Sequence, residues 1–177
     1  MTGDTGAAAS CIVVMGVSGV GKTTLGRELS RRLHLPFIDG DNLHSAHNVD
    51  KMRAGIPLSD RDRVPWLDDV GAVLASSNGV IVACSALKRE YRDRIRHLAP
   101  RTFFLELDAT PAFIASRLAN RADHFMPESL LASQLESLEP LQNENGMRID
   151  VEGDTEKVLE LTVAACTAAF GGERSLA

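Results

Sequence analysis

Hydrophobic residues occur along this chain in short runs, separated by longer stretches with helical spacing. The runs are rich in Val, Ile and Phe and lack polar alternation, which is typical of strands in a parallel sheet that is covered on both faces. They predict five strands, at residues 11–16, 36–39, 79–85, 102–108 and 147–151.

The stretches between these runs predict helices at residues 22–33, 43–54, 60–76, 87–98, 111–120, 127–138 and 154–169. Strands that alternate with helices in this way favour a three-layer α/β fold, with a five-stranded parallel sheet and helices on both faces. Residues 40–78 are too many for one simple crossover, so we expect them to form a helical insertion beside the sheet.

The length and composition of the chain predict a single domain over 1–177, with its ordered part at 10–177. At 177 residues and 44% hydrophobic content, the chain is long enough for one core and short for two. The first ten and the last seven residues have little apolar content, and we expect these ends to be frayed.

Charge and cysteine content limit the classes of partner. The net charge is −5 and the charged residues are evenly spread, which argues against nucleic acid but leaves a small anionic ligand possible. Cys11, Cys84 and Cys166 lie inside apolar runs without metal-type spacing, which favours a reduced, cytoplasmic compartment. We find no signal peptide and no apolar run near the roughly 18 residues of a membrane span, so we expect no membrane partner.

The string GVSGVGKT at residues 16–23 matches the phosphate-binding loop (P-loop) pattern Gly-x-x-x-x-Gly-Lys-Ser/Thr, between a predicted strand and a predicted helix. Its backbone N–H groups and the helix N-terminus can surround a phosphate. We expect Lys22 to reach the β- and γ-phosphates and Thr23 to bind Mg²⁺. No Asn-Lys-x-Asp string for reading guanine occurs, so ATP is preferred. The nucleotide-binding candidates are Gly16, Ser18, Gly19, Val20, Gly21, Lys22, Thr23 and Thr24. The alternative is a glycine-rich turn with an incidental lysine.

Two aspartates, Asp39 and Asp41, follow the second predicted strand and are separated only by a glycine. The third strand ends in CSA without an acidic residue, so we expect Asp39 to support the magnesium ion together with Thr23. If the backbone stays extended through Gly40, Asp41 points the same way and can orient the hydroxyl that attacks the phosphate. The alternative is that Asp41 only caps the helix that begins near Leu43.

Several segments together carry a family resemblance: GVSGVGKTT, DGDNLH, NVDKM, GIPLSDRDRVPWL, ACSALKREYRD and RLANRADHF. From about residue 12 to 140 the chain resembles gluconokinases of the small P-loop type, and residues 39–67 are the most specific part. The resemblance implies phosphorylation of D-gluconate by ATP at the 6-hydroxyl, giving 6-phospho-D-gluconate, as a step of gluconate utilisation. It also implies a fold similar to nucleoside monophosphate kinases and shikimate kinase, and a homodimer.

A polyhydroxy acid needs cations for its carboxylate and short polar groups for its hydroxyls. The candidates are His44, Asn48, Lys51 and Arg63 in the insertion, and Ser85, Lys88 and Arg92 after the third strand. Alternatively, His44 pairs with Asn48, Arg63 pairs with Asp60, and the residues after the third strand pair with Glu90, Asp93 or solvent. We expect Trp66 to anchor the insertion by packing.

Arg117 and Arg121 lie one helical turn apart, before Pro127. The segment at 121–128 resembles the mobile lid of these kinases, which implies that both arginines act catalytically on the phosphates. We expect backbone near residues 151–155 to read adenine, because the last strand-to-helix turn lies over that side in similar folds. Two other functions stay open: another small-molecule kinase such as shikimate kinase, although CSA stands where that family has consecutive glycines, or a regulatory module that binds nucleotide without transfer.

Overall fold

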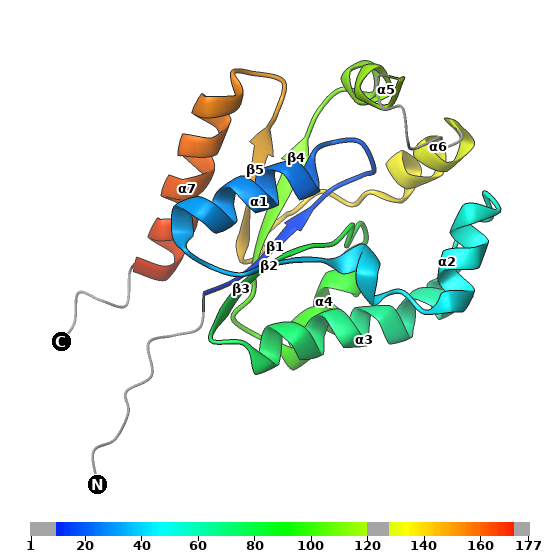
Figure 1. Cartoon of the computed structure of the whole chain (residues 1–177), viewed down its shortest axis with the longest axis horizontal. Coiled ribbons are helices and arrows are strands. Elements are labelled where there is room, and N and C mark those ends of the chain that lie inside the picture. Colours follow the sequence, from blue (N-terminus) through cyan, green and yellow to red (C-terminus); the bar gives the residue numbers. More distant parts are fainter. Residues whose placement is uncertain (1–9, 120–127, 172–177) are drawn as a thin grey trace, which may run out of the picture.

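The structure, a computed structural model, describes residues 10–119 and 128–171 and contains one parallel sheet (Figure 1). The strands are β1 (Ser10–Met15), β2 (Phe37–Asp39), β3 (Gly79–Ala83), β4 (Phe103–Asp108) and β5 (Gly146–Asp150). They lie in the order β2-β3-β1-β4-β5, and all pairs are parallel. The predicted five-stranded parallel sheet is confirmed.

Each predicted helix has a counterpart near its expected position. The helices are α1 (Lys22–Leu33), the 3-10 helix η1 (Gly40–Leu43), α2 (Ala46–Arg53), α3 (Asp60–Ser76), α4 (Arg89–Leu98), α5 (Pro111–Ala119), α6 (Glu128–Ser137) and α7 (Thr155–Gly171). The main difference is at 43–54, where a 3-10 turn precedes the α-helix.

The sheet separates two hydrophobic clusters, which makes the fold three-layered. Ile12 and Val14 on β1 face the cluster that includes Leu29 of α1 and Val158 of α7. Cys11, Val13 and Met15 face the cluster on the other side, whose members from α3 and α4 are Trp66, Leu67, Val70, Leu74, Tyr91 and Ile95. Because successive side chains of a strand point to opposite faces, an unbroken apolar run buries both faces of β1. The two helical layers are visible in Figure 1, with α1 and α7 on one side of the sheet and α3 and α4 on the other.

The chain between β2 and β3 folds into η1, α2 and α3, and its helices begin at well-formed caps. The Ser45 side chain accepts a hydrogen bond from the Asn48 N–H at the start of α2. Ser59 and Asp62 form a reciprocal capping box at the start of α3. These caps satisfy N–H groups that a helix leaves unpaired at its first turn, so the sequence itself sets where α2 and α3 begin.

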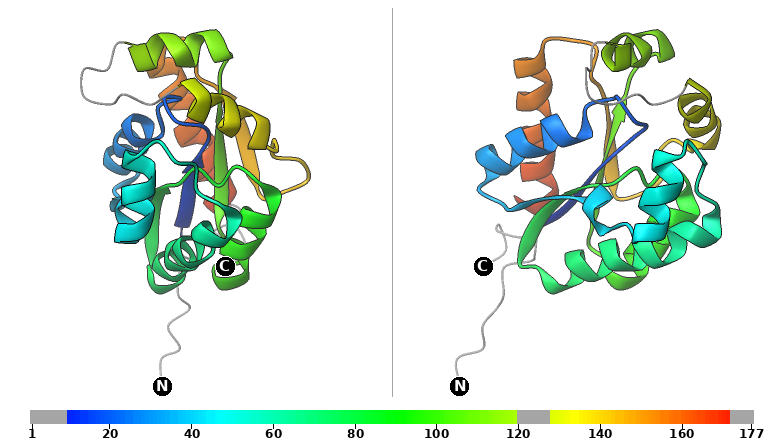
Figure 2. Two further views of the ribbon diagram at one scale, coloured as in Figure 1. Left: turned by 90° about the vertical axis from the view of Figure 1, so that its right-hand side faces the viewer. Right: turned by 45° about the vertical axis from the view of Figure 1, so that its right-hand side comes forward.

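The loop after β1 lies where the strand order reverses, because β3 and β4 flank β1 on opposite sides. In open α/β sheets, ligands bind at this position, outside the carboxyl ends of the strands. Figures 1 and 2 show α2, α5 and α6 around this end of the sheet. Across the described residues, no helix combines the length and the apolar character needed to cross a bilayer.

Candidate functional site

The P-loop, residues 16–23, follows β1 and leads into α1. Gly16, Gly19 and Gly21 have φ angles of 137°, 85° and 112°, which side chains other than glycine rarely adopt. At Gly19 and Gly21 the space is also filled. A Cβ at Gly19 would lie 2.7 Å from Cγ of Leu118, and one at Gly21 would lie 3.1 Å from a guanidinium nitrogen of Arg117. Helix α5 therefore lies directly against the loop.

Several polar groups of the loop already make hydrogen bonds within the protein. Lys22 Nζ donates to the carbonyl of Val17 over 3.0 Å. The N–H of Ser18 donates to Oε1 of Gln134 over 2.7 Å, and Nε2 of Gln134 donates to the Ser18 hydroxyl over 3.2 Å. Val20 is buried and Thr24 is exposed. Gln134 of α6 is thus hydrogen-bonded to both polar groups of Ser18, which is one of the nucleotide-binding candidates.

Asp39 lies beside the P-loop, at the carboxyl end of β2. Its Oδ2 accepts a hydrogen bond from the Thr23 hydroxyl over 3.0 Å. Asp39 pairs in register with Ala83 at the end of β3, so β2 supplies the carboxylate that β3 lacks. A hydroxyl and a carboxylate oxygen are hard donors, and kinase sites typically hold Mg²⁺ through one or two such protein oxygens with phosphate and water. Thr23 and Asp39 therefore fit a magnesium ion.

Gly40, between the two aspartates, passes very close to β3. A Cβ there would lie 2.4 Å from the carbonyl oxygen of Ala83, so only glycine fits. The expectation of an extended backbone through Gly40 is wrong, because the chain turns into η1 at this residue. The turn is closed by the N–H of Asp41, which donates to Oδ1 of Asp39 over 3.2 Å.

Asp41 does not cap the following α-helix, because Ser45 does. The Asp41 side chain is exposed, and its charge affects the pKa values of Cys84 and His44. Burial raises the pKa of the Cys84 thiol to about 12, and the Asp41 carboxylate also raises it. The same carboxylate favours protonation of His44, although burial leaves the pKa of His44 below its usual value. Asp41 thus lies near the end of β3, where an acceptor would meet the P-loop.

Arg63 of α3 and Lys88, just before α4, converge on one acidic residue and one phenol. Lys88 Nζ lies 2.9 Å from Oδ2 of Asp60, and Arg63 lies 3.5 Å from Oδ1. Both cations lie over the ring of Tyr91, at 5.6 Å and 5.3 Å from its centroid. The Tyr91 hydroxyl donates to Asp60. Lys88 Nζ also lies 3.4 Å from Oε1 of Glu90, and the hydrogen bonds from Lys88 and Tyr91 lower the pKa of Asp60. The cluster therefore holds two cations and two carboxylates.

The remaining insertion candidates are held within the insertion. Lys51 Nζ lies 2.6 Å from Oδ2 of Asp62. Nδ2 of Asn48 lies 3.3 Å from Nδ1 of His44, and Asn48 is only 3% exposed. Trp66 is buried, as expected of an anchor. Its indole N–H donates to the Gly40 carbonyl over 2.7 Å, and its ring stacks on His44.

The expectation that Arg92 lines the acceptor pocket is wrong, because its side chain is fully buried and has no surface for an acceptor. It forms a two-pronged ion pair with Glu144, at 2.9 Å and 2.6 Å, and donates to the carbonyls of Ala86 and Leu87. Arg92 therefore fastens the loop after β3, which carries Ser85, to the segment before β5. Ser85 stays at the site, since its carbonyl accepts a hydrogen bond from the N–H of Gly16 over 3.3 Å.

The structure places one of the two expected phosphate-binding arginines. A guanidinium nitrogen of Arg117 donates to the carbonyl of Val20 over 3.2 Å, so this side chain already lies on the P-loop. Arg121 and most of the expected lid, 121–128, lie outside the described residues.

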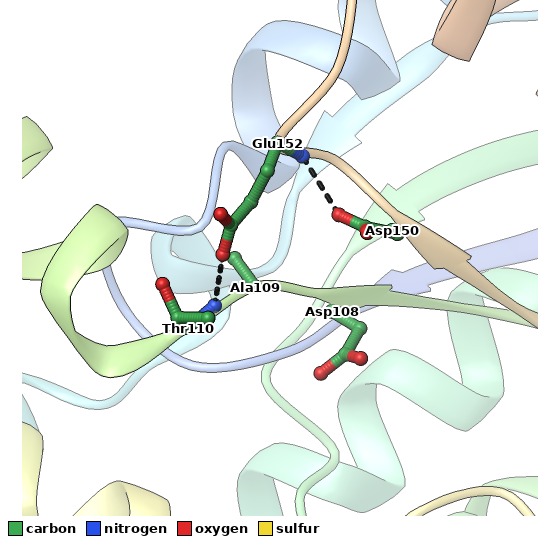
Figure 3. Close-up of a pocket in the computed structure, with 5 residues that line it drawn as sticks. All are labelled: Asp108, Ala109, Thr110, Asp150 and Glu152. Atoms are coloured by element: carbon green, nitrogen blue, oxygen red, sulfur yellow. Dashed lines mark hydrogen bonds between the residues drawn. The ribbon is translucent and has the colours of Figure 1, made fainter.

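A hollow of about 270 Å³ opens at the carboxyl ends of β4 and β5 (Figure 3). It is lined by Asp108, Ala109, Thr110, Asp150 and Glu152. Glu152 accepts a hydrogen bond from the Thr110 N–H and so joins the two strand ends. The hollow includes part of the turn at 151–155, where we expect adenine.

Sequence reasoning missed three residues that shape the site: Gln134, Tyr91 and Glu144. Gln134 lies 116 residues from its partner Ser18, and Glu144 lies 52 from Arg92, so no local spacing indicates either contact. Tyr91 had one usable signal, since it is the only tyrosine and stands between candidate residues Lys88 and Arg92.

Comparisons with known proteins agree with this geometry. A family model described as an AAA domain matches residues 11–141. The thermosensitive gluconokinase of Escherichia coli K12 is 45% identical over 159 residues, which covers 86% of this chain and 85% of that protein. The crystal structure of a gluconokinase from Sinorhizobium meliloti 1021 has a TM-score of 0.88 at 41% identity and covers 94% of this chain and 97% of that one.

A shikimate kinase from Aquifex aeolicus is much more distant. It has a TM-score of 0.57 at 18% identity, covering 91% of this chain and 98% of that one, and so shares the fold alone. Neither competing function expected from the sequence, another small-molecule kinase or a regulatory module, is favoured by the comparisons. The chain is an enzyme of the kinase class, and it belongs to the gluconokinase family of P-loop kinases.

Proposed function

We propose that this protein transfers the γ-phosphoryl group of ATP to the 6-hydroxyl of D-gluconate. The observation that carries the proposal is the position of Asp41, exposed at the end of β2 and hydrogen-bonded through its N–H to Asp39, which in turn contacts Thr23 of the P-loop. Asp39 thus connects Thr23 of the phosphate site to Asp41, the group that orients the acceptor. The relatives are named gluconokinases, which supports this acceptor.

On the donor side, the P-loop N–H groups and Lys22 bind the phosphates of ATP, and Thr23 with Asp39 holds Mg²⁺. The ion neutralises charge on the phosphates when it is bound. Lys22 donates to the Val17 carbonyl in this structure, so its ammonium group lies within the P-loop. We place adenine at the hollow of Figure 3, because its lining includes Glu152 from the turn at 151–155.

On the acceptor side, Asp41 accepts the proton of the 6-hydroxyl as the oxygen attacks the phosphorus. Phosphoryl transfer requires positioning and charge stabilisation more than covalent chemistry, so one well-placed carboxylate is sufficient. Arg63 and Lys88 bind the gluconate carboxylate, because they already converge on the carboxylate of Asp60. His44 and Ser85 contact hydroxyls. Lys51 takes part through its ion pair with Asp62, which fixes the start of α3 beside the acceptor.

Arg117 and Arg121 neutralise negative charge that develops on the phosphoryl group during transfer. The hydrogen bond from Arg117 to the Val20 carbonyl of the P-loop supports this role for Arg117. Closure of the segment at 121–128 over the phosphates would exclude water, which would otherwise hydrolyse ATP. We also place the enzyme in the cytoplasm as a homodimer, and light scattering on the purified protein tests the oligomeric state.

The position of the new phosphate ester tests the proposal. We would incubate the protein with Mg-ATP and uniformly ¹³C-labelled D-gluconate and read phosphorus–carbon couplings by NMR. Coupling to C6 and C5 alone is the expected result. A phosphate ester at another carbon would contradict the proposed placement of the 6-hydroxyl, and free phosphate without any ester would contradict transfer to gluconate.

A further inference from the structure

Asn48 lies between a backbone carbonyl and a histidine ring, and this fixes the direction of two hydrogen bonds. Its Nδ2 donates to the carbonyl oxygen of Asp62 over 2.9 Å and lies 3.3 Å from Nδ1 of His44. A carbonyl oxygen only accepts, so the atom between the two partners is the amide nitrogen. Because that nitrogen carries donors only, Nδ1 of His44 must accept and the ring proton must be on Nε2.

The ring of His44 is also held on its face. It stacks on Trp66 with ring centroids 4.2 Å apart and an interplanar angle of 17°. The indole N–H of Trp66 in turn donates a hydrogen bond to the Gly40 carbonyl. Burial lowers the pKa of His44, the Asp41 carboxylate raises it, and the Arg63 guanidinium lowers it, with a net lowering. This lowering agrees with the neutral ring that the hydrogen bond from Asn48 to Nδ1 requires. Within the described residues, no hydrogen-bond partner is recorded for its Nε2.

We propose that Asn48 is a positioning residue that fixes His44 in the neutral Nε2–H tautomer, so that His44 donates a hydrogen bond to a hydroxyl oxygen of the acceptor. This inference rests on the proposed function, and it removes Asn48 itself from the residues that touch the acceptor. The burial of Asn48, at 3% exposed, agrees with a role exerted through His44.

A neutral donor at this place serves the chemistry. Asp41 must accept a proton from the attacking hydroxyl, and an imidazolium nearby would stabilise its charged form and make it a weaker base. A neutral N–H can still orient a hydroxyl without that effect. The pairing with Asn48 therefore gives the site a hydrogen-bond donor close to Asp41 that does not add a positive charge.

Nitrogen NMR on ¹⁵N-histidine-labelled full-length protein tests the tautomer without reference to activity. At about pH 7 we expect Nδ1 of His44 to have the shift of an unprotonated nitrogen and Nε2 that of a protonated one. We also expect D-gluconate, but not a non-hydrolysable ATP analogue alone, to shift the Nε2 resonance. A protonated Nδ1 in the wild type, or an Nε2 resonance unmoved by saturating gluconate, would overturn the proposal.

Three variants, two of them a matched pair at His44, extend the test to kinetics. In Asn48→Asp the carboxylate accepts from Nδ1–H and the donor to the Asp62 carbonyl is lost, so His44 no longer holds the neutral Nε2–H form. We expect kcat/KM for gluconate to fall by about tenfold or more, with unchanged ATP affinity. His44→Gln keeps a donor near the Nε2 position and retains more activity than His44→Asn. A protonated Nδ1 in Asn48→Asp with unchanged kcat/KM would show that the pair is only structural. If the wild type binds gluconate at Nε2 and yet transfers no phosphate, the proposed function fails while this inference stands.

Discussion

The hydroxyl of Thr23 donates to the carboxylate of Asp39 over 3.0 Å, and this contact joins the first turn of α1 to the end of β2. It brings together two oxygen donors that lie 16 positions apart in the sequence. Many P-loop enzymes take the acidic partner from the strand beside β1, which here is β3 and ends in Ala83. In this chain the carboxylate comes one strand further out.

Changing Asp39 to Asn should weaken magnesium binding and leave the fold intact. The amide keeps the shape of the side chain but loses the charge that stabilises the ion. We expect the Mg²⁺ concentration for half-maximal rate to rise by roughly 10–100-fold, as for other residues that support a metal. A magnesium titration at saturating ATP and gluconate measures this. Asp69→Asn, an exposed carboxylate on α3, is the control and should behave as wild type.

Changing Asp41 to Asn should remove the group that accepts the proton and leave nucleotide binding unaffected. We expect kcat to fall by about 10²–10⁴-fold, the usual contribution of a positioned general base. Calorimetric titration with an ATP analogue should give the wild-type affinity. Unchanged kcat would exclude Asp41 as the base, and a large loss of ATP affinity would place it on the donor side.

Changing Arg117 to Ala should slow the transfer step, because this guanidinium lies on the P-loop at Val20. Arginines that stabilise the transferring phosphoryl group contribute roughly 10³-fold or more to kcat. Rapid-quench measurement of a single turnover isolates this step from product release. Arg31→Ala is the control, since Arg31 is exposed on α1 and pairs only with Glu28 among the described residues. Equal rates for the two variants would remove Arg117 from the mechanism.

The apolar runs predicted the strands because buried parallel strands leave a continuous signal in the sequence. The P-loop was equally readable, because its glycines, lysine and threonine each answer a local requirement of phosphate binding. Its surroundings were not, since the contacts of Gly19 with Leu118 and of Ser18 with Gln134 join segments about a hundred residues apart. Spacing along one element says nothing of such contacts.

The two expectations that the structure corrects fail for a shared reason. Asp41 was placed on the condition of an extended backbone, while the chain turns into η1 at Gly40, where it passes close to Ala83. Arg92 was placed by its helical spacing from Lys88, while Glu144 draws it into the interior. In both cases a partner from another segment decides where a polar side chain goes.

The burial of Arg92 predicts a large effect on stability. Arg92→Met leaves Glu144, which is 2% exposed, without its main partner, and removing one member of a buried pair costs about 3–5 kcal/mol. Arg94→Met, two positions away, removes an exposed pair with Asp68 and should cost about 1 kcal/mol or less. Urea unfolding measures both. The double variant Arg92→Met with Glu144→Leu should recover most of the loss, and failure to recover would mean that the pair is not what Arg92 contributes.

The same pair predicts how stability depends on pH. Burial raises the pKa of Glu144. The hydrogen bond and charge of Arg92 and the charge of Arg96 lower this pKa by more, so in the folded state it lies below its usual value. A depressed pKa stabilises the fold above the unfolded pKa of about 4.3, and this stabilisation is lost as the pH falls through the folded value. The unfolding free energy of the wild type should therefore decline below about pH 5, and the double variant should decline less steeply. Parallel slopes would contradict this assignment.

The most direct test of the account is ADP release by the purified protein with Mg-ATP, measured in parallel with D-gluconate, with shikimate, with other sugar acids and with no acceptor. We predict rapid ADP release with D-gluconate and only background release in the other reactions. Tight ATP binding without any stimulation by gluconate would contradict the proposed function, although it would leave the P-loop site in place.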